Sequence, residues 1–217
     1  VPADVFPAHG FARSAPWQVR DANLASDGTV WLTLELPRAA MPAALWPHVT
    51  ALELAVGLGS GLQLRLTTRN EDTHAVVLGE ALHTYFRISD IAAVALQGLD
   101  GATYWDTVGS VERKVQHGAI RFAAETDRVY VDSEAACRID DPGFGRCIHI
   151  RKRGSRSTVV WNPWIAKALR MGDLGQPDGW REMLCVESAN AWDNRIVLQP
   201  GETHVMEVDY RVEALPA

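Results

Sequence analysis

The sequence is poor in cysteine, lacks a long apolar run and has little helical periodicity. Among its 217 residues are three cysteines, odd in number and without a CxxC spacing: Cys137, Cys147 and Cys185. This usage favours reduced thiols over a disulfide framework and predicts a cytoplasmic protein. No run of 18 apolar residues occurs, and the first residues have neither the basic region nor the apolar core of a signal peptide. We therefore expect no membrane partner.

Signatures of metal, covalent and nucleotide chemistry are missing too. The seven histidines show no HxxxH or HxH pairing near a carboxylate, and there is no GxSxG string. Gly57, Gly59 and Gly61 form a GxGxG string, but strand-like runs flank it on both sides. A dinucleotide site needs such glycines between a strand and a helix, so the string predicts a hairpin connection. We expect neither a metal nor a cofactor.

The charge balance bears on possible partners. A formal net charge of −6 argues against nucleic acid or an anionic membrane surface as a partner. The one basic cluster, Arg151–Arg156, lies between two strand-like runs and contains Gly-Ser, so we predict a solvated hairpin tip there. An anionic substrate would need local arginines that act against the average charge.

Short strand-like runs with turn residues between them recur along the whole chain, which predicts an all-β sandwich or barrel. Only two segments have a helical pattern, 39–45 and 163–171. Without a repeat or a linker, one domain over residues 1–217 is expected. The predicted strands are 29–36, 50–56, 62–68, 76–88, 92–96, 128–131, 147–150, 157–161, 183–188 and 204–212.

Two of these runs contain a single titratable residue among apolar ones. His83 lies within 81–86, and Glu187 lies within 183–189. A histidine titrates near neutral pH, so the two residues suggest a proton-transfer site that faces one pocket. A hydrogen-bonded core histidine is the alternative for His83. A buried Glu187 needs a partner such as Arg13 or a wet cleft. Asp127 is open to two interpretations, an ion pair or an acceptor for hydroxyls at a pocket rim.

Taken together, several segments resemble the hexose-6-phosphate mutarotases of the aldose 1-epimerase superfamily, in the family's order and over nearly the whole chain. The matching strings are PAHGFAR (7–13) with Pro16-Trp17, WPH (46–48), ALHTYF (81–86) with Ile88 and Asp90-Ile91, TDRVY (126–130), WNP (161–163) and CVESA (185–189).

The resemblance implies a galactose mutarotase-like β-supersandwich that interconverts the α and β anomers of a hexose 6-phosphate, with glucose 6-phosphate as the expected substrate and no cofactor. His83 and Glu187 match the family's catalytic positions. Arg13 matches a position near the phosphate, Asp127 one near the sugar hydroxyls, and His9 lies beside Arg13 and is expected to line the pocket.

The family's early strands, which carry a further phosphate-contacting arginine, have no counterpart in this sequence. Because Val1 is not a methionine, we expect the natural protein to extend upstream of it. Two rival functions stay open at this point: a carbohydrate-binding sandwich without catalysis, and a mutarotase of unphosphorylated aldoses.

Overall fold

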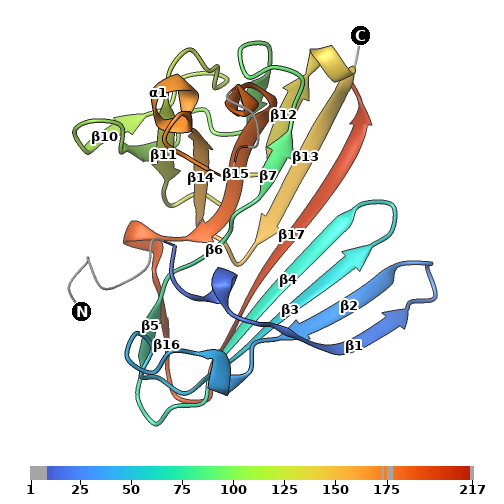
Figure 1. The fold of residues 1–217 in the computed structure, drawn as a ribbon, viewed down its shortest axis with the longest axis vertical. Helices are drawn as coiled ribbons and strands as arrows, with labels where there is room; N and C mark the ends of the chain where they lie inside the picture. The colour runs from blue at the N-terminus through green and yellow to red at the C-terminus, as the bar shows by residue number, and fades with distance from the viewer. Residues whose placement is uncertain (1–8, 173, 175–177, 216–217) are drawn as a thin grey trace. The chain divides into compact units, whose positions relative to one another are not determined.

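The regular structure of the chain is almost entirely β. The computed structural model describes residues 9–172, 174 and 178–215, and Figure 1 shows their strands. Contacts divide them into two compact units: the residues up to Leu78 with Val197–Glu207, and Gly79–Ile196 with the residues from Val208 onward. The all-β class is confirmed, whereas one domain over residues 1–217 stays a prediction. Within the described part of the chain, no helix has the length and apolar character to cross a membrane.

The first unit is built on an antiparallel meander. Strand β17 passes from this unit into the second, and a two-stranded ladder of β5 and β16 accompanies the meander. The order of the strands is β1-β2-β3-β4, followed by the first part of β17. Their bounds are β1 Gln18–Leu24, β2 Val30–Glu35, β3 Thr50–Leu58, β4 Leu62–Asn70, β5 Val76–Leu78, β16 Ile196–Leu198 and β17 Thr203–Ala214, with the 3₁₀ turns η1 Ala12–Ser14 and η2 Arg38–Ala40.

Only part of the glycine string at residues 57–61, in the first unit, forms a turn. The predicted hairpin connection is confirmed, since β3 ends at Leu58 and β4 begins at Leu62. Gly57, however, lies within β3 opposite Trp31 of β2. A Cβ atom at Gly57 would come within 2.7–2.8 Å of three atoms of the Trp31 ring. Gly57 therefore serves packing, because only a residue without a side chain leaves room for the indole.

The second unit contains two β layers. One is the sheet β10-β9-β11-β14-β15-β6, with β7 also paired to β15. The other consists of β13, β12 and β8 together with the last part of β17. The bounds are β6 Glu80–Leu82, β7 Tyr85–Arg87, β8 Ala95–Gln97, β9 Thr103–Asp106, β10 Glu112–Val115, β11 Thr126–Tyr130, β12 Cys137–Asp141, β13 Arg146–Arg153, β14 Ser157–Asn162 and β15 Met183–Asn190; the helical turns are η3 Pro142–Phe144, α1 Trp164–Ala168, η4 Gly179–Glu182 and η5 Trp192–Asn194.

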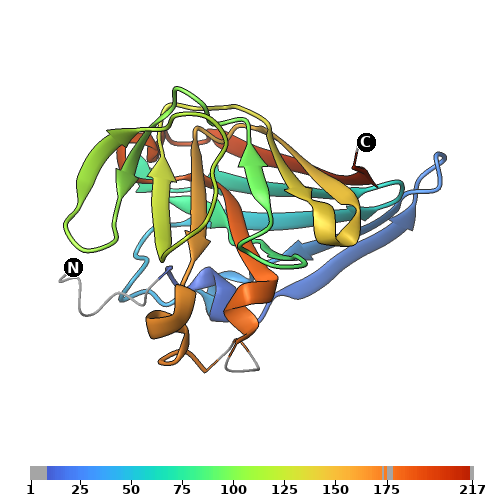
Figure 2. The same cartoon turned by 90° about the horizontal axis from the view of Figure 1, so that it is seen from above.

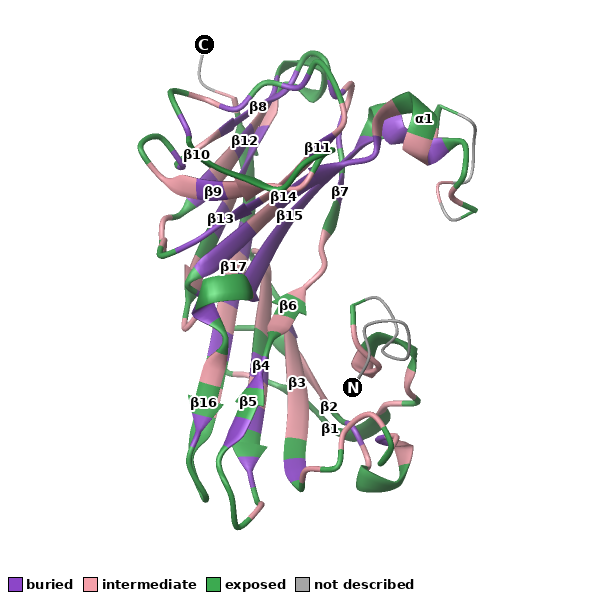
Figure 3. Ribbon diagram, turned by 90° about the vertical axis from the view of Figure 1, so that its left-hand side faces the viewer, coloured by how far each residue is buried: buried purple, intermediate pink, exposed green. Residues whose placement is uncertain are grey.

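The core of this unit lies between its two layers. All eight residues of β15 are buried, as are five of the six in β14, and both strands are purple along most of their length in Figure 3. Phe86 of β7 contacts Tyr210 of β17 with ring centroids 5.5 Å apart, which joins the layers. Buried side chains of the second layer include Ile139, Ile148 and Ile150.

Four predicted elements need correction. The run 92–96 begins as a turn, and only its last two residues belong to β8. The run 76–88 is not one strand but β5, β6 and β7, interrupted at Gly79 and at His83-Thr84. Pro42 breaks the first helical candidate, so only the 3₁₀ turn η2 remains, before that proline. The second candidate shortens to the five residues of α1, which follows β14 directly at the end of the sheet (Figures 1 and 2).

The basic cluster is not a hairpin tip, which corrects the prediction. Strand β13 ends at Arg153 and β14 begins at Ser157, but β13 lies between β12 and β17 while β14 lies between β11 and β15, so the segment connects one layer of the unit to the other. Lys152 departs from the solvated interpretation. Its Nζ atom donates to Ser157 O at 2.7 Å and to Thr158 Oγ1 at 2.8 Å, and burial lowers its pKa to about 8. Lys152 is thus a structural residue that ties the end of β13 to the start of β14.

Candidate active site

Strand β15 places a carboxyl group on one face of the second unit's sheet. Glu187 lies in the middle of this fully buried strand and is only 5% exposed. Side chains alternate along a strand, so Cys185 shares the face of Glu187, while Val186 and Ser188 point to the other side. The antiparallel ladder pairs Glu187 with Val159 of the central strand β14. Glu187 is therefore held by backbone pairing on a rigid element.

An interruption of the neighbouring strand brings His83 to this carboxyl group. The ladder of β6 with β15 ends at Leu82–Ser188, and the ladder of β7 resumes at Tyr85–Cys185. Both ladders have the same register, which leaves His83 directly across from Glu187. The amide of Thr84 donates to Leu82 O at 2.9 Å, a tight turn that replaces ladder bonding at this point.

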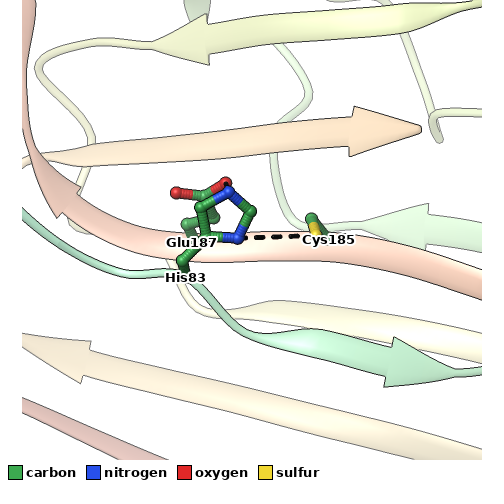
Figure 4. A group of neighbouring side chains, drawn as sticks. All are labelled: His83, Cys185 and Glu187. Carbon is green, nitrogen blue, oxygen red and sulfur yellow. Dashed lines mark hydrogen bonds and ion pairs between the residues drawn. The ribbon is translucent and has the colours of Figure 1, made fainter. Parts of the chain in front are cut away.

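The two side chains meet in the gap. Nε2 of His83 lies 3.2 Å from Oε1 of Glu187. Nδ1 of the same imidazole lies 3.7 Å from Sγ of Cys185, so the ring stands between the carboxyl group and the thiol (Figure 4). His83 also stacks on Tyr85, with ring centroids 5.0 Å apart and an angle of 13° between the planes. The stacking and the two polar contacts fix the orientation of the imidazole.

The environment of Glu187 disfavours its charged form. Burial raises the pKa of Glu187 to about 8, and the negative charge of Asp127 adds to the rise. A carboxyl group with such a pKa exchanges a proton near neutral pH. The side chain of His83 is 20% exposed and that of Glu187 is 6% exposed, so the imidazole is the more accessible member of the pair. This arrangement can take up and release one proton from either side chain.

Asp127 lies on the same face, two strands away from β15. The register pairs Asp127 with Trp161, and Trp161 with Cys185, across β11, β14 and β15. Neighbouring strands are about 4.8 Å apart, which puts the backbone of Asp127 about 10 Å from that of Cys185. That span is close to the width of a pyranose ring with its hydroxyl groups. The face from Asp127 to His83 can thus contact opposite sides of one small polar ligand.

Lys167 of α1 balances the acidic side of this face. Its Nζ atom is 3.5 Å from Oδ2 of Asp127 and 3.2 Å from Oε1 of Glu125, and it lies 5.6 Å from the ring centroid of Trp161. The ion pair keeps Asp127 in place while its side chain stays 28% exposed. Of the two interpretations left open by the sequence, the structure gives Asp127 the ion pair and does not test the contact with sugar hydroxyls.

Two of the predicted binding residues belong to the first unit. His9 is exposed and has a positive φ of 65°, and Arg13 is exposed within η1. The contribution of these two residues to the site stays a prediction, as do the roles assigned to His83, Glu187 and Asp127. Pro7 and Ala8, which begin the matching string, lie outside the described residues.

Sequence reasoning did not assign a role to four side chains at this face: Tyr85, Trp161, Lys167 and Cys185. For Cys185 and Tyr85 the signal was present, because residues two positions from Glu187 or His83 on a predicted strand share the same face. The other two depend on strand pairing and on the packing of α1, which the order of residues alone does not reveal.

A nitrogen, a sulfur and an oxygen ligand atom come together at His83, Cys185 and Glu187, and such a set could hold a soft divalent metal. The imidazole, however, presents Nε2 to the carboxyl group and Nδ1 to the thiol. A metal bonds one of these nitrogens, so the ring would have to turn or shift to hold an ion between the other two ligands. The geometry fits an acid–base pair better.

Comparison with known proteins places this chain in a family context. The family model described as "Aldose 1-epimerase" matches residues 2–211. A protein of Escherichia coli (strain K12) named "Putative glucose-6-phosphate 1-epimerase" is 33% identical over 202 residues, which make up 93% of this chain and 66% of the relative. A protein of the same name from Cenchrus ciliaris is 37% identical over 205 residues, 89% of this chain and 61% of the relative. The chain thus spans somewhat less than two thirds of the length of these relatives.

Solved structures agree on the fold. A Salmonella typhimurium protein described as "a putative mutarotase (YeaD)" superposes with a TM-score of 0.87 at 29% identity, over 99% of this chain and 70% of that one. A galactose mutarotase-like protein from Clostridium acetobutylicum gives a TM-score of 0.74 at 13% identity, over 95% of this chain and 69% of that one. The second likeness concerns the fold alone. The galactose mutarotase-like fold that the sequence predicted is confirmed.

Proposed function

The chain belongs to the aldose 1-epimerase family, and we propose that it interconverts the α and β anomers of a hexose 6-phosphate, with glucose 6-phosphate as the substrate. The observation that carries the proposal is the contact of 3.2 Å between His83 Nε2 and Glu187 Oε1. An acid and a base on one face are what the opening of a cyclic hemiacetal requires. The names of the two curated relatives support the phosphorylated sugar as substrate.

Ring opening needs one proton removed and one supplied. Glu187, as carboxylate, takes the proton from the hydroxyl on C1 while His83, as imidazolium, gives a proton to the ring oxygen. The bond between C1 and the ring oxygen breaks, and C1 becomes a carbonyl carbon. Rotation about the C1–C2 bond exposes the other carbonyl face, and the two side chains reverse their roles as the ring closes. Both protons return, and no electrons are transferred.

The electrostatics of the pair suit this exchange. An effective general base has a pKa near the working pH, and the pKa of Glu187 is raised to about 8. A carboxylate in that environment is a stronger base than one in water. The proton can also pass directly between Glu187 and the neighbouring imidazole. Either side chain can therefore hold it when the reaction begins, so the reaction can start from either anomer.

The remaining predicted residues orient the sugar. Asp127 accepts hydrogen bonds from sugar hydroxyls, while Arg13 pairs with the phosphate and His9 lines the pocket beside it. An arginine can bind phosphate with two parallel hydrogen bonds, which fixes position as well as charge. These contacts contribute orientation rather than bond making.

Anomerisation kinetics test the proposal directly. Freshly dissolved α-glucose 6-phosphate and α-glucose are followed by polarimetry, and exchange between anomers at equilibrium is followed by NMR. We expect acceleration of the phosphorylated sugar and little effect on glucose. Equal acceleration of both sugars would make the protein an epimerase of neutral aldoses. Binding of either sugar without acceleration would leave a carbohydrate-binding sandwich and overturn the enzymatic proposal.

A further inference from the structure

A second group of potential metal ligands lies on the other β layer of the second unit, apart from His83 and Glu187. Cys147 and His149 of β13 are two residues apart, so both point to the same face of the strand. Sγ of Cys147 is 3.4 Å from Nε2 of His149, and the same Nε2 is 3.4 Å from Oε2 of Glu213 near the end of β17. A sulfur, a nitrogen and an oxygen therefore converge from two strands.

We propose that Cys147, His149 and Glu213 form a binding site for a divalent metal ion of the zinc class, independent of the epimerase function proposed above. Zinc in proteins takes cysteine sulfur at about 2.3 Å and imidazole nitrogen or carboxylate oxygen at about 2.0–2.2 Å, in tetrahedral geometry. A tetrahedron with those bond lengths has nitrogen–sulfur and nitrogen–oxygen edges of about 3.3–3.6 Å. Both distances from Nε2 of His149 fall within that interval.

This cluster differs from the one at Glu187 in the number of imidazole nitrogens that contact the other two ligands, one here and two there. In the second cluster the same Nε2 atom faces both the thiol and the carboxylate, so an ion can bond all three atoms without rotation of the ring. An imidazolium–carboxylate ion pair alone would explain the approach of His149 to Glu213. The sulfur, which is a weak hydrogen-bond partner, lies equally close to that nitrogen and is also 3.9 Å from the carbonyl oxygen of Ala214, next to Glu213.

Charge and access also fit a divalent ion. A thiolate and a carboxylate together carry two negative charges, which a divalent cation neutralises. Arg138 is directly across from His149, but its guanidinium is bound to Asp140 at 2.6 and 3.1 Å, so its positive charge is already balanced. Cys147 is buried, while the side chains of His149 and Glu213 are 27% and 62% exposed. A cavity of about 270 Å³ is lined by Arg138 and Asp140 among others, which are the register partners of His149 and Cys147 across β12 and β13.

The bound ion would link β13 to the last residues of β17. Three protein ligands leave the fourth tetrahedral position to a water molecule. Because an ion that binds only the folded chain stabilises it by mass action, the site would couple the stability of this layer to the supply of metal.

Cobalt substitution and thermal unfolding test the site on the untagged chain of 217 residues. Co²⁺ should give a thiolate charge-transfer band with a stoichiometry of one, and Zn²⁺ should displace it and raise the melting temperature. Cys147→Ser should remove the band, and Glu213→Gln should weaken Co²⁺ binding by at least the roughly 10- to 100-fold that loss of a ligand's supporting partner costs. Anomerisation by Cys147→Ser without metal should equal that of the wild type.

The second cluster supplies the matched control. Cys185→Ser should keep the cobalt band, because the proposed ligands are intact. Loss of the band in Cys185→Ser with retention in Cys147→Ser would assign the metal to the site of Glu187 and overturn the proposal, as would the absence of any band in the wild type. If Cys147→Ser fails to fold, His149→Ala and Glu213→Gln decide the question, since their side chains are partly or largely exposed.

Discussion

His83 and Glu187 are directly across from each other at the gap between the two ladders that β6 and β7 form with β15. The ladders on either side of the gap, Leu82–Ser188 and Tyr85–Cys185, have the same register. The gap frees the backbone of His83 from ladder bonding and lets the imidazole approach the carboxyl group to 3.2 Å. In a regular strand the two backbones would be paired, and the side chains would lie side by side without this 3.2 Å contact.

The first prediction concerns the carboxyl group. Glu187→Gln keeps the size and most of the polar contacts of the side chain but cannot accept a proton. We expect anomerisation of glucose 6-phosphate to fall by about 10²- to 10⁴-fold, the usual contribution of a positioned base, while the fold is retained. Polarimetry gives the rate, and circular dichroism checks the fold. Glu182→Gln is the control, since Glu182 immediately precedes β15 and its side chain is 61% exposed. Wild-type turnover by Glu187→Gln would remove the base assignment.

The second prediction concerns the imidazole. His83→Ala should lose anomerisation to a similar degree and change the melting temperature only slightly, because His83 is not among the buried residues of the core. Kinetics and thermal unfolding are measured on the same preparations. The exposed His117 serves as the control histidine of the same unit, replaced by alanine. A large drop in melting temperature, with residual activity in proportion to the folded fraction, would return His83 to the role of a core residue.

The third prediction uses the charge of Asp127, which contributes to the raised pKa of Glu187. Asp127→Asn removes that charge, so the pKa of Glu187 should fall. The base must be ionised to act, and kcat/KM on the acidic side should therefore begin to rise at lower pH than in the wild type. Glu125→Gln is the matched control, because Glu125 shares Lys167 with Asp127 but is not among the causes of the shift at Glu187. An unchanged pH profile in Asp127→Asn would contradict the electrostatic coupling.

Some strands of the fold could be predicted from the sequence, and others could not. The period of two along 50–56 and 62–68 was enough to locate β3 and β4, whose observed bounds begin at the predicted residues. The apolar run around Glu187 correctly indicated a buried strand. Strands with mixed or exposed faces, such as β1 and β10, gave no clear alternation and were missed.

The site was harder to predict because it depends on pairing between distant strands. The run around His83 looked like one continuous strand, and no local signal marked the break that sets the imidazole against Glu187. The contact of Lys167 with Asp127 could not be predicted for the same reason, since it depends on how α1 folds back after β14. Hydrophobic periodicity and composition describe single helices and strands. Which side chains lie close together depends on the register in which distant strands pair.

The fourth prediction tests a packing relationship in the first unit. Gly57→Ala would place a Cβ atom within 2.7–2.8 Å of the Trp31 ring, and overpacking of this kind costs about 1–3 kcal/mol. Urea unfolding should show a lower midpoint with an unchanged slope. Gly172→Ala is the control, because a Cβ atom there meets nothing within 4 Å. Equal midpoints for Gly57→Ala and the wild type would mean that the indole moves aside without cost.

The fifth prediction follows from the pKa of Glu187 and concerns stability. The pKa is about 8 in the folded chain and near its ordinary 4.5 when unfolded, so between these values the folded state binds more protons than the unfolded state. The contribution of Glu187 to the free energy of unfolding must then decrease as pH rises from 4.5 to about 8 and level off above it. One pKa unit corresponds to about 1.4 kcal/mol, which makes the decrease measurable. Glu187→Gln has no group to ionise, so its stability relative to the wild type should grow across the same interval. Urea unfolding of both proteins at several pH values gives this difference, and a difference independent of pH would show that the carboxyl group titrates normally in the folded chain.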